Sequence, residues 1–244
     1  MPNWSYSNLS DRAPGPFVSA AARLVPGVRQ VRDQIGPYAA AWQEHNRQAL
    51  RQDGPLWVAL GDSMTQGIGA SAYDRGWVGQ LAGRLAGCGL VSRVVNLSVS
   101  GARVAEVLGR QLPALEALET TGTLAGPPAL VTLLIGSNDL IRRRRRLESP
   151  ATFELLLQRL PAGTVVANLP NPNRAAAAVN RSLQQAVTDR GLVLAELRRG
   201  RTVSWRGRLA ADHFHPNDRG YAAIVDAFAA AILPAAGDPT PRAP

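Results

Sequence analysis

The chain has 244 residues, of which 45% are hydrophobic and 18% charged, so it can bury a core and is globular rather than disordered. The single cysteine excludes an internal disulfide framework and any site with several cysteine ligands, and its neighbours predict a packed thiol at Cys88. The net charge is +9 and the chain contains arginine but no lysine, which is compatible with nucleic acid, anionic lipid or acidic substrates. No stretch approaches the ~18 apolar residues of a membrane helix, and the first residues lack a signal-peptide pattern. We therefore expect a soluble, cytoplasmic protein.

The N-terminal part of the chain has two sections of different character. Residues 1–17 are polar and rich in proline and glycine, and we expect little order there. Residues 18–52 contain many helix formers and place Tyr38, Trp42 and Leu50 on roughly one side of a helix, which Asp53-Gly54-Pro55 ends. The chain is therefore divided into a partly helical extension, an α/β domain and a loose C-terminal tail: residues 1–52, 53–235 and 236–244.

From residue 55 onward, strand-like and helix-like segments alternate. The predicted strands cover residues 56–61, 91–98, 128–136, 163–169 and 191–197. The predicted helices lie near residues 75–87, 103–119, 150–160, 173–190 and 217–233. Several strands are nearly continuous apolar runs, as expected for a parallel sheet covered on both faces. This alternation predicts a three-layer α/β/α domain with a doubly wound parallel sheet, in which ligands bind beyond the carboxyl ends of the strands.

A serine follows the first predicted strand, in Gly61-Asp62-Ser63. One interpretation is a helix cap or turn, since Asp and Ser are common where a strand leads into a helix. The other is a nucleophile at the helix entrance, where backbone N–H groups can stabilise an oxyanion. The Gly-X-Ser-X-Gly pattern of the nucleophile elbow does not surround Ser63.

A serine nucleophile needs a base, and the chain has three histidines. His45 lies in the N-terminal helix among polar residues and is expected to be solvated. His215 follows Asp212 by three residues before a proline, a spacing that lets the carboxylate meet one imidazole nitrogen while the other faces Ser63. His213 is the competing base, and a polar loop with incidental histidines is the alternative to both.

Two more strand ends carry candidate groups. Asn138, in Gly136-Ser137-Asn138-Asp139, follows the third strand and could donate its amide to an oxyanion. Gly101 follows the second strand and is permissive enough for its N–H to approach a substrate closely. A turn asparagine and an ordinary turn glycine are the alternatives.

These four segments, in this order, resemble the SGNH hydrolases, the GDSL-type serine esterases and lipases. The resemblance covers about residues 55–233 and departs at Met64, where leucine is frequent, and in the extension, which has no counterpart in the minimal domain. It implies a flavodoxin-like sheet, ester hydrolysis through an acyl-serine, and no metal or organic cofactor. It further implies that Ser63 is the nucleophile, His215 the base and Asp212 its orienting acid. The implied oxyanion donors are the backbone N–H groups of Ser63 and Gly101 and the side chain of Asn138.

Alternatives to hydrolysis remain. The same scaffold could act as an acyltransferase, or be an inactive scaffold that binds anionic partners through the arginine run Arg142–Arg146. That run is a solvated face, or a basic lip beside the site for anionic esters or an anionic membrane surface. Asp62 and Asp139 are interpreted as local structure. A metal site at Asp212, His213 and His215 is disfavoured by crowding, and a dinucleotide site at residues 67–72 by the lack of a later acid.

Overall fold

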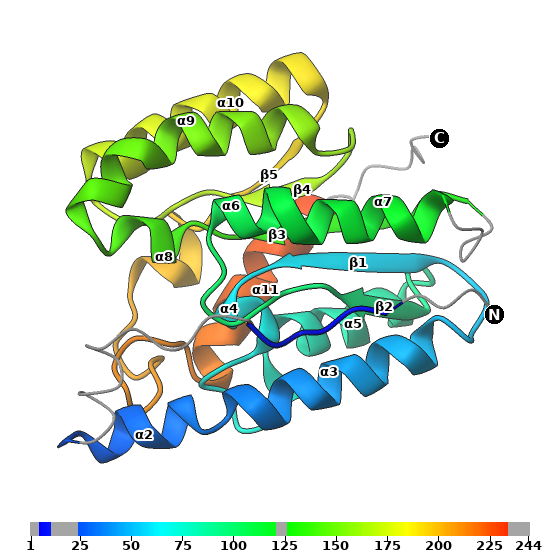
Figure 1. Ribbon diagram of the computed structural model, residues 1–244, viewed down its shortest axis with the longest axis horizontal. Coiled ribbons are helices and arrows are strands. Elements are labelled where there is room, and N and C mark those ends of the chain that lie inside the picture. The colour runs from blue at the N-terminus through cyan, green and yellow to red at the C-terminus, as the bar shows by residue number, and fades with distance from the viewer. Residues whose placement is uncertain (1–4, 11–23, 121–125, 234–244) are drawn as a thin grey trace.

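Five parallel strands form one sheet in the order β2-β1-β3-β4-β5 (Figure 1). The computed structural model describes residues 5–10, 24–120 and 126–233. The strands are β1 (Leu56–Gly61), β2 (Arg93–Asn96), β3 (Leu130–Leu134), β4 (Val165–Ala167) and β5 (Val193–Ala195). The register between β1 and β3 runs from Trp57 opposite Leu130 to Gly61 opposite Leu134. This order is the flavodoxin-like arrangement, so the predicted fold class is confirmed.

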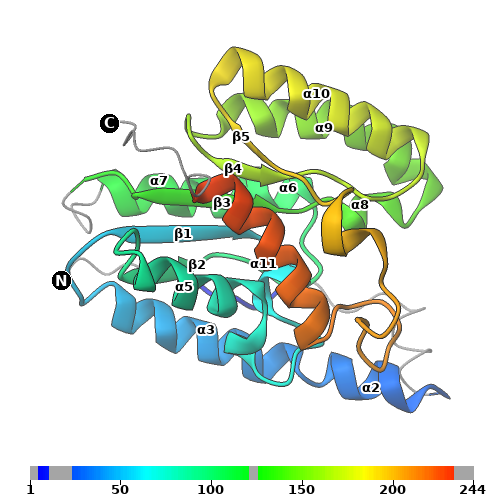
Figure 2. The ribbon, with the colours of Figure 1, turned by 180° about the vertical axis from the view of Figure 1, so that it is seen from behind.

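Helices cover both faces of the sheet, as Figures 1 and 2 show from opposite sides. The longer ones are α3 (Ile35–Ala49), α5 (Trp77–Gly87), α7 (Leu112–Thr120), α9 (Arg143–Arg159), α10 (Arg174–Arg190) and α11 (Asp218–Ile232). The shorter ones are α2 (Pro26–Arg32), α4 (Ser63–Gln66), η1 (Tyr73–Arg75), α6 (Val104–Glu106), η2 (Val107–Gln111), α8 (Ser137–Leu140) and η3 (Gly200–Val203).

Alternate residues of β1 show how the layers are built. Val58 and Leu60 point into a core shared with α7, α9 and α10. Trp57 and Ala59 point into the opposite core, where α5 and α11 pack. A strand buried on both faces requires the continuous apolar run seen in the sequence.

Besides the strands β2 to β5, which are shorter than predicted, the structure differs from the sequence-based expectations at two helices and at Cys88. α9 begins at Arg143 rather than near residue 150, and Pro150 lies inside it. A π-helical stretch, η2, interrupts the helix expected over residues 103–119. Cys88 follows the end of α5 and is exposed, so the prediction of a packed thiol was wrong.

The N-terminal extension packs along the edge of the sheet at β2. Residues 5–10, expected to have little order, are held there: the Tyr6 hydroxyl donates to the carbonyl of Leu97, and Asn8 donates to the carbonyls of Asn96 and Ser98. α3 adds a bond from Asn46 to the carbonyl of Asn96. The predicted loose tail at residues 236–244 lies outside the described residues.

Candidate active site

Ser63 lies directly beyond the carboxyl end of β1, at the first position of α4. Asp62 caps this helix by accepting the backbone N–H of Met64 over 3.0 Å. Gly61 before it has no room for a side chain, because an added Cβ would lie 2.4 Å from the carbonyl oxygen of Leu134 on β3. Ser63 is buried, so its side chain has less rotational freedom than that of an exposed serine.

The candidate base and acid meet Ser63 from the other end of the chain. His215 Nε2 lies 2.9 Å from Ser63 Oγ, and His215 Nδ1 lies 2.6 Å from Asp212 Oδ2. Asp212 Oδ1 accepts the backbone N–H groups of Phe214 and His215, each over 3.0 Å. Burial acts to raise the pKa of Asp212, but these hydrogen bonds outweigh it and lower the pKa. Asp212 is thus held as a carboxylate against the imidazole.

The other two histidines lie outside this arrangement. His213 is exposed and has a left-handed backbone, with φ of 55°. His45 is half-buried rather than solvated, with its ring edge-on to Trp42 at 5.1 Å, and burial lowers its pKa. Of the three, His215 alone has a hydrogen bond to Ser63 within the described residues.

The three candidate oxyanion donors come from the ends of three neighbouring strands. The backbone N–H groups of Ser63 and Gly101 form no hydrogen bond within the part of the chain that the structure describes. Gly101 is in the left-handed region, at φ +76°. Asn138 Nδ2 instead already donates to the carbonyl of Ala102 over 2.9 Å and to Asp62 Oδ2 over 3.3 Å. To meet an oxyanion, Asn138 has to exchange the longer of these bonds.

Asp62 and Asp139 were expected to stabilise only their own turns. In the structure, both also form hydrogen bonds to segments that are distant in the sequence. Asp62 accepts from Ser137 Oγ as well as from Asn138, and Asp139 accepts the backbone N–H of Val104 over 3.2 Å. Burial raises the pKa of each to about 6. Both carboxyls therefore hold the strand ends together at a cost in desolvation.

Gln111 was missed by the sequence analysis. It lies at the end of η2, is fully buried, and closes a two-way hydrogen bond with Gly61: Oε1 accepts its N–H and Nε2 donates to its carbonyl, each over 2.8 Å. π-helical turns often occur at functional sites because they redirect a side chain. Here the turn fixes the backbone two residues before Ser63. A glutamine within an apolar helix was the available signal.

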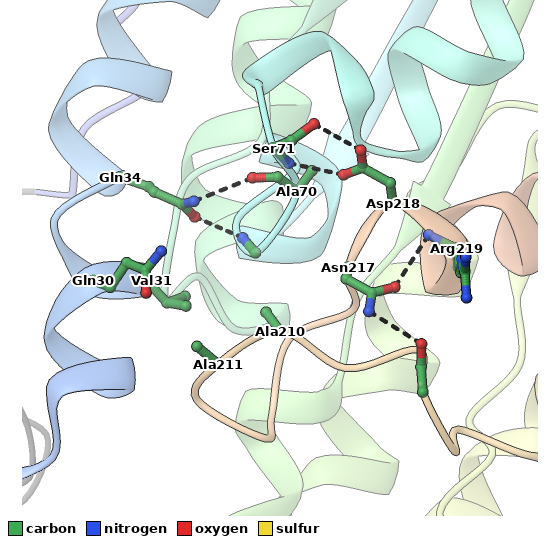
Figure 3. Close-up of a pocket in the computed structure, with 12 residues that line it drawn as sticks. Gln30, Val31, Gln34, Ala70, Ser71, Ala210, Ala211, Asn217, Asp218 and Arg219 are labelled. Carbon is green, nitrogen blue, oxygen red and sulfur yellow. Dashed lines mark hydrogen bonds between the residues drawn. The ribbon is translucent and has the colours of Figure 1, made fainter.

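The loop after Ser63 is held by the N-terminal extension, as Figure 3 shows for Gln34. Gln34 accepts the N–H of Gly69 over 2.8 Å and donates to the carbonyl of Ala70 over 3.1 Å. Tyr38 donates to the same carbonyl over 2.8 Å, and Trp42 donates to that of Gln66 over 3.0 Å.

This braced loop packs directly behind the candidate base. A Cβ added to Gly69 would lie 2.8 Å from His215 Cβ, so the two backbones are in close contact. The extension therefore supports the site through the loop, although its sequence carries no catalytic motif.

A cavity of about 500 Å³ lies between the extension and the start of α11 (Figure 3). Its walls include Gln34, Ser71 and Asp218, and Asp218 is bonded to the N–H and hydroxyl of Ser71. Neither Ser63 nor His215 lines it. It is therefore separate from the candidate site.

Most of the α/β domain matches a known protein family. Residues 59–223 match the GDSL-like lipase/acylhydrolase family. The chain belongs to this family. An 85-residue stretch is 42% identical to the esterase TesA of Pseudomonas aeruginosa, and it covers 35% of this chain and 38% of that protein.

Solved structures agree with this membership in the GDSL-like family. A crystal structure of TesA has 26% identity and a TM-score of 0.57, over 70% of this chain and 94% of that chain. The esterase EstA from Pseudoalteromonas sp. has 22% identity and a TM-score of 0.55, over 72% and 96%. The acetylxylan esterase Axe2 from Geobacillus stearothermophilus has 21% identity and a TM-score of 0.55, over 72% and 93%. The last two show the shared three-layer fold.

The family match begins within β1 and so leaves out the extension that braces the loop at Gly69. This GDSL-like protein also has no helix, within its described residues, that is long and apolar enough to cross a membrane. The described residues contain no cluster of three His, Cys, Asp or Glu side chains arranged to hold a metal ion.

Proposed function

We propose that this GDSL-like protein hydrolyses carboxylic esters through an acyl intermediate on Ser63. The observation that carries the proposal is the continuous chain of hydrogen bonds from Ser63 Oγ through His215 to Asp212, with separations of 2.9 and 2.6 Å. A hydroxyl aligned on an imidazole, which is oriented in turn by a carboxylate, is the arrangement that activates serine for nucleophilic attack. The family of esterases and lipases supports the same reaction.

Acylation begins when Ser63 Oγ attacks the ester carbonyl carbon and its proton passes to His215 Nε2. Asp212 holds the Nδ1–H and stabilises the imidazolium that forms. The negative oxygen of the tetrahedral intermediate accepts from the N–H groups of Ser63 and Gly101, which have no other partner among the described residues, and from Asn138. The carbon–oxygen bond to the leaving group then breaks, and His215 returns its proton to the departing alkoxide.

Deacylation repeats these steps with water. His215 Nε2 takes a proton from a water molecule, whose oxygen attacks the acyl carbon bound to Ser63. The tetrahedral intermediate collapses, the bond to Ser63 Oγ breaks, and His215 protonates that oxygen. The carboxylic acid leaves and the site is restored.

A panel of p-nitrophenyl esters of increasing acyl length tests this proposal and reports the preferred chain length. We expect wild-type protein to hydrolyse at least the short esters, and Ser63→Ala to lose roughly 10⁴–10⁶-fold in turnover, the scale of losing a triad member. An alkyl p-nitrophenyl phosphonate should react with Ser63 Oγ and release p-nitrophenol, so the peptide that contains Ser63 should gain the mass of the phosphonyl group alone. Equal turnover by the wild type and the folded Ser63→Ala variant would refute the proposal.

A further inference from the structure

The arginine run closely follows, in the chain, the helix that carries Asn138 of the candidate site. α8 carries Asn138, and α9 starts three residues after α8 ends. In Figure 1, α8 and the start of α9 lie toward the same end of the molecule as α4, which carries Ser63. Figure 2 shows the same neighbourhood of α8 and α9 from behind. We call residues 141–147 the basic-apolar surface.

The positive charge of this surface is largely free for a partner. Residues 141–153 contain five arginines and one acid, Glu148. Arg142, Arg143 and Arg144 are exposed, and the side chain of Arg144 is 90% exposed despite a 3.5 Å contact with Glu148. An ion pair this long and exposed contributes little, so it leaves the attraction for anions in place.

Apolar side chains project among these arginines. Ile141 is 59% exposed and Leu147 is 79% exposed. Leu147 lies four residues after Arg143 and three after Arg144 on α9, so the three share a helix face. At the candidate site itself, Phe214 is 43% exposed and packs edge-on against His215 at 4.9 Å.

We propose that the basic-apolar surface docks on the anionic headgroup surface of a lipid bilayer. Each arginine near such a surface contributes about 1 kcal/mol of attraction. Isoleucine and leucine side chains enter the boundary between headgroups and acyl chains, which a polyanion such as DNA does not offer. The proposal goes beyond ester hydrolysis and does not depend on it, although docking here would face the site toward esters held in the bilayer.

Sedimentation with vesicles tests the proposal without measuring activity. We expect the full chain to bind phosphatidylglycerol/phosphatidylcholine vesicles, to leave pure phosphatidylcholine vesicles unbound, and to be released by salt. Arg143→Gln with Arg144→Gln should weaken binding about 30-fold, from two contributions of about 1 kcal/mol. The matched control is Arg51→Gln with Arg181→Gln, which removes the same charge from exposed positions on α10 and after α3, and should weaken it less than about threefold.

Three results would overturn the proposal. One is no binding to anionic vesicles, with or without binding to duplex DNA at the same salt. The second is an equal loss in both arginine pairs, which would indicate total charge rather than this surface. The third is unchanged binding of Ile141→Ser with Leu147→Ser. Turnover of a short soluble ester should be unchanged in all these variants, so failure of docking and failure of ester hydrolysis are distinguishable.

Discussion

Asp62 and Asn138 are joined across the candidate site, because Asn138 Nδ2 donates to Asp62 Oδ2 over 3.3 Å. Ser137 donates to the same oxygen over 3.1 Å, and the other oxygen of Asp62 caps α4 at Met64. The Asp62 carboxylate therefore joins the start of α4, where the proposed nucleophile Ser63 lies, to the proposed oxyanion donor Asn138. This makes Asp62 a positioning residue for both.

Replacing Asn138 by alanine tests its proposed place in the oxyanion hole. We expect kcat to fall about 10²–10³-fold, as for loss of a single oxyanion donor, with a smaller change in KM. Steady-state kinetics with p-nitrophenyl acetate measure both constants. A loss of less than about threefold would remove Asn138 from the hole and leave it as a link between Asp62 and Ala102.

Asp62→Asn tests whether this carboxylate orients Asn138. The variant keeps an acceptor for Met64 but presents an NH2 group, a donor, to the Asn138 amide. We expect kcat to fall roughly 10-fold because a small displacement of a positioned group is costly. KM should change little. Ser137→Ala removes the neighbouring bond to the same oxygen and leaves the Asn138 bond in place, so it is the matched control and should retain most activity.

The raised pKa of Asp62 predicts how stability varies with pH. Burial raises this pKa from 3.8 to about 6, so between these pH values the folded state holds a proton that the unfolded state has released. The free energy of unfolding should therefore fall as pH rises through this window, by roughly 3 kcal/mol in all.

Urea unfolding of wild type and Asp62→Asn at several pH values isolates this contribution. The free energy of unfolding of Asp62→Asn, relative to that of the wild type, should increase between pH 4 and 6.5 and then stay level, because the amide of the variant does not ionise. A difference that is independent of pH, or that grows toward acid, would contradict the prediction. Comparison of the two proteins removes the titration of groups that they share.

Substitutions of His215 and His213 should have opposite effects on activity. His215→Ala should lower kcat/KM by roughly 10⁴–10⁶-fold because it removes the proposed base. His213→Asn, two residues away, should leave activity nearly unchanged, because His213 is exposed and asparagine tolerates its left-handed backbone. If the His213 variant were the inactive one, the assignment of the base would be reversed.

The bonds from α3 to the loop behind His215 predict that the extension affects catalysis. Gln34→Ala removes both contacts with Gly69 and Ala70, and we expect kcat to fall about 10-fold through a slight shift of His215. Gln34→Glu keeps an acceptor for Gly69 and should restore part of the rate. Gln48→Ala is the control, because Gln48 lies on α3, the helix that follows Gln34, but donates its hydrogen bond to Glu44 instead of to the loop. A fall in melting temperature with an unchanged kcat would indicate support of the fold alone.

Much of the fold could be predicted because a buried strand or helix face requires apolar residues at a regular spacing in the sequence. Strand β1 is covered on both faces, so its six residues are all apolar or small, and its predicted limits agree with the structure. The same apolar runs located the ends of β1, β2 and β3, after which Ser63, Gly101 and Asn138 lie. Parallel strands end at one edge of the sheet, so these residues were expected to lie close together. Pro150 illustrates the limit, because packing of α9 on α10 holds a helix that local propensity disfavours.

The sequence by itself determined which residue types stand at the strand ends and in what order. The family resemblance favoured His215 over His213, but only the tertiary structure placed His215 Nε2 within hydrogen-bond distance of Ser63 Oγ, 152 positions away. Only the tertiary structure, too, decided that Asp62 and the extension hold the surrounding loops. The physical reason is that hydrophobic periodicity specifies which face is buried, whereas a hydrogen bond requires positions within about 3 Å. Those positions are set by how all the layers pack together.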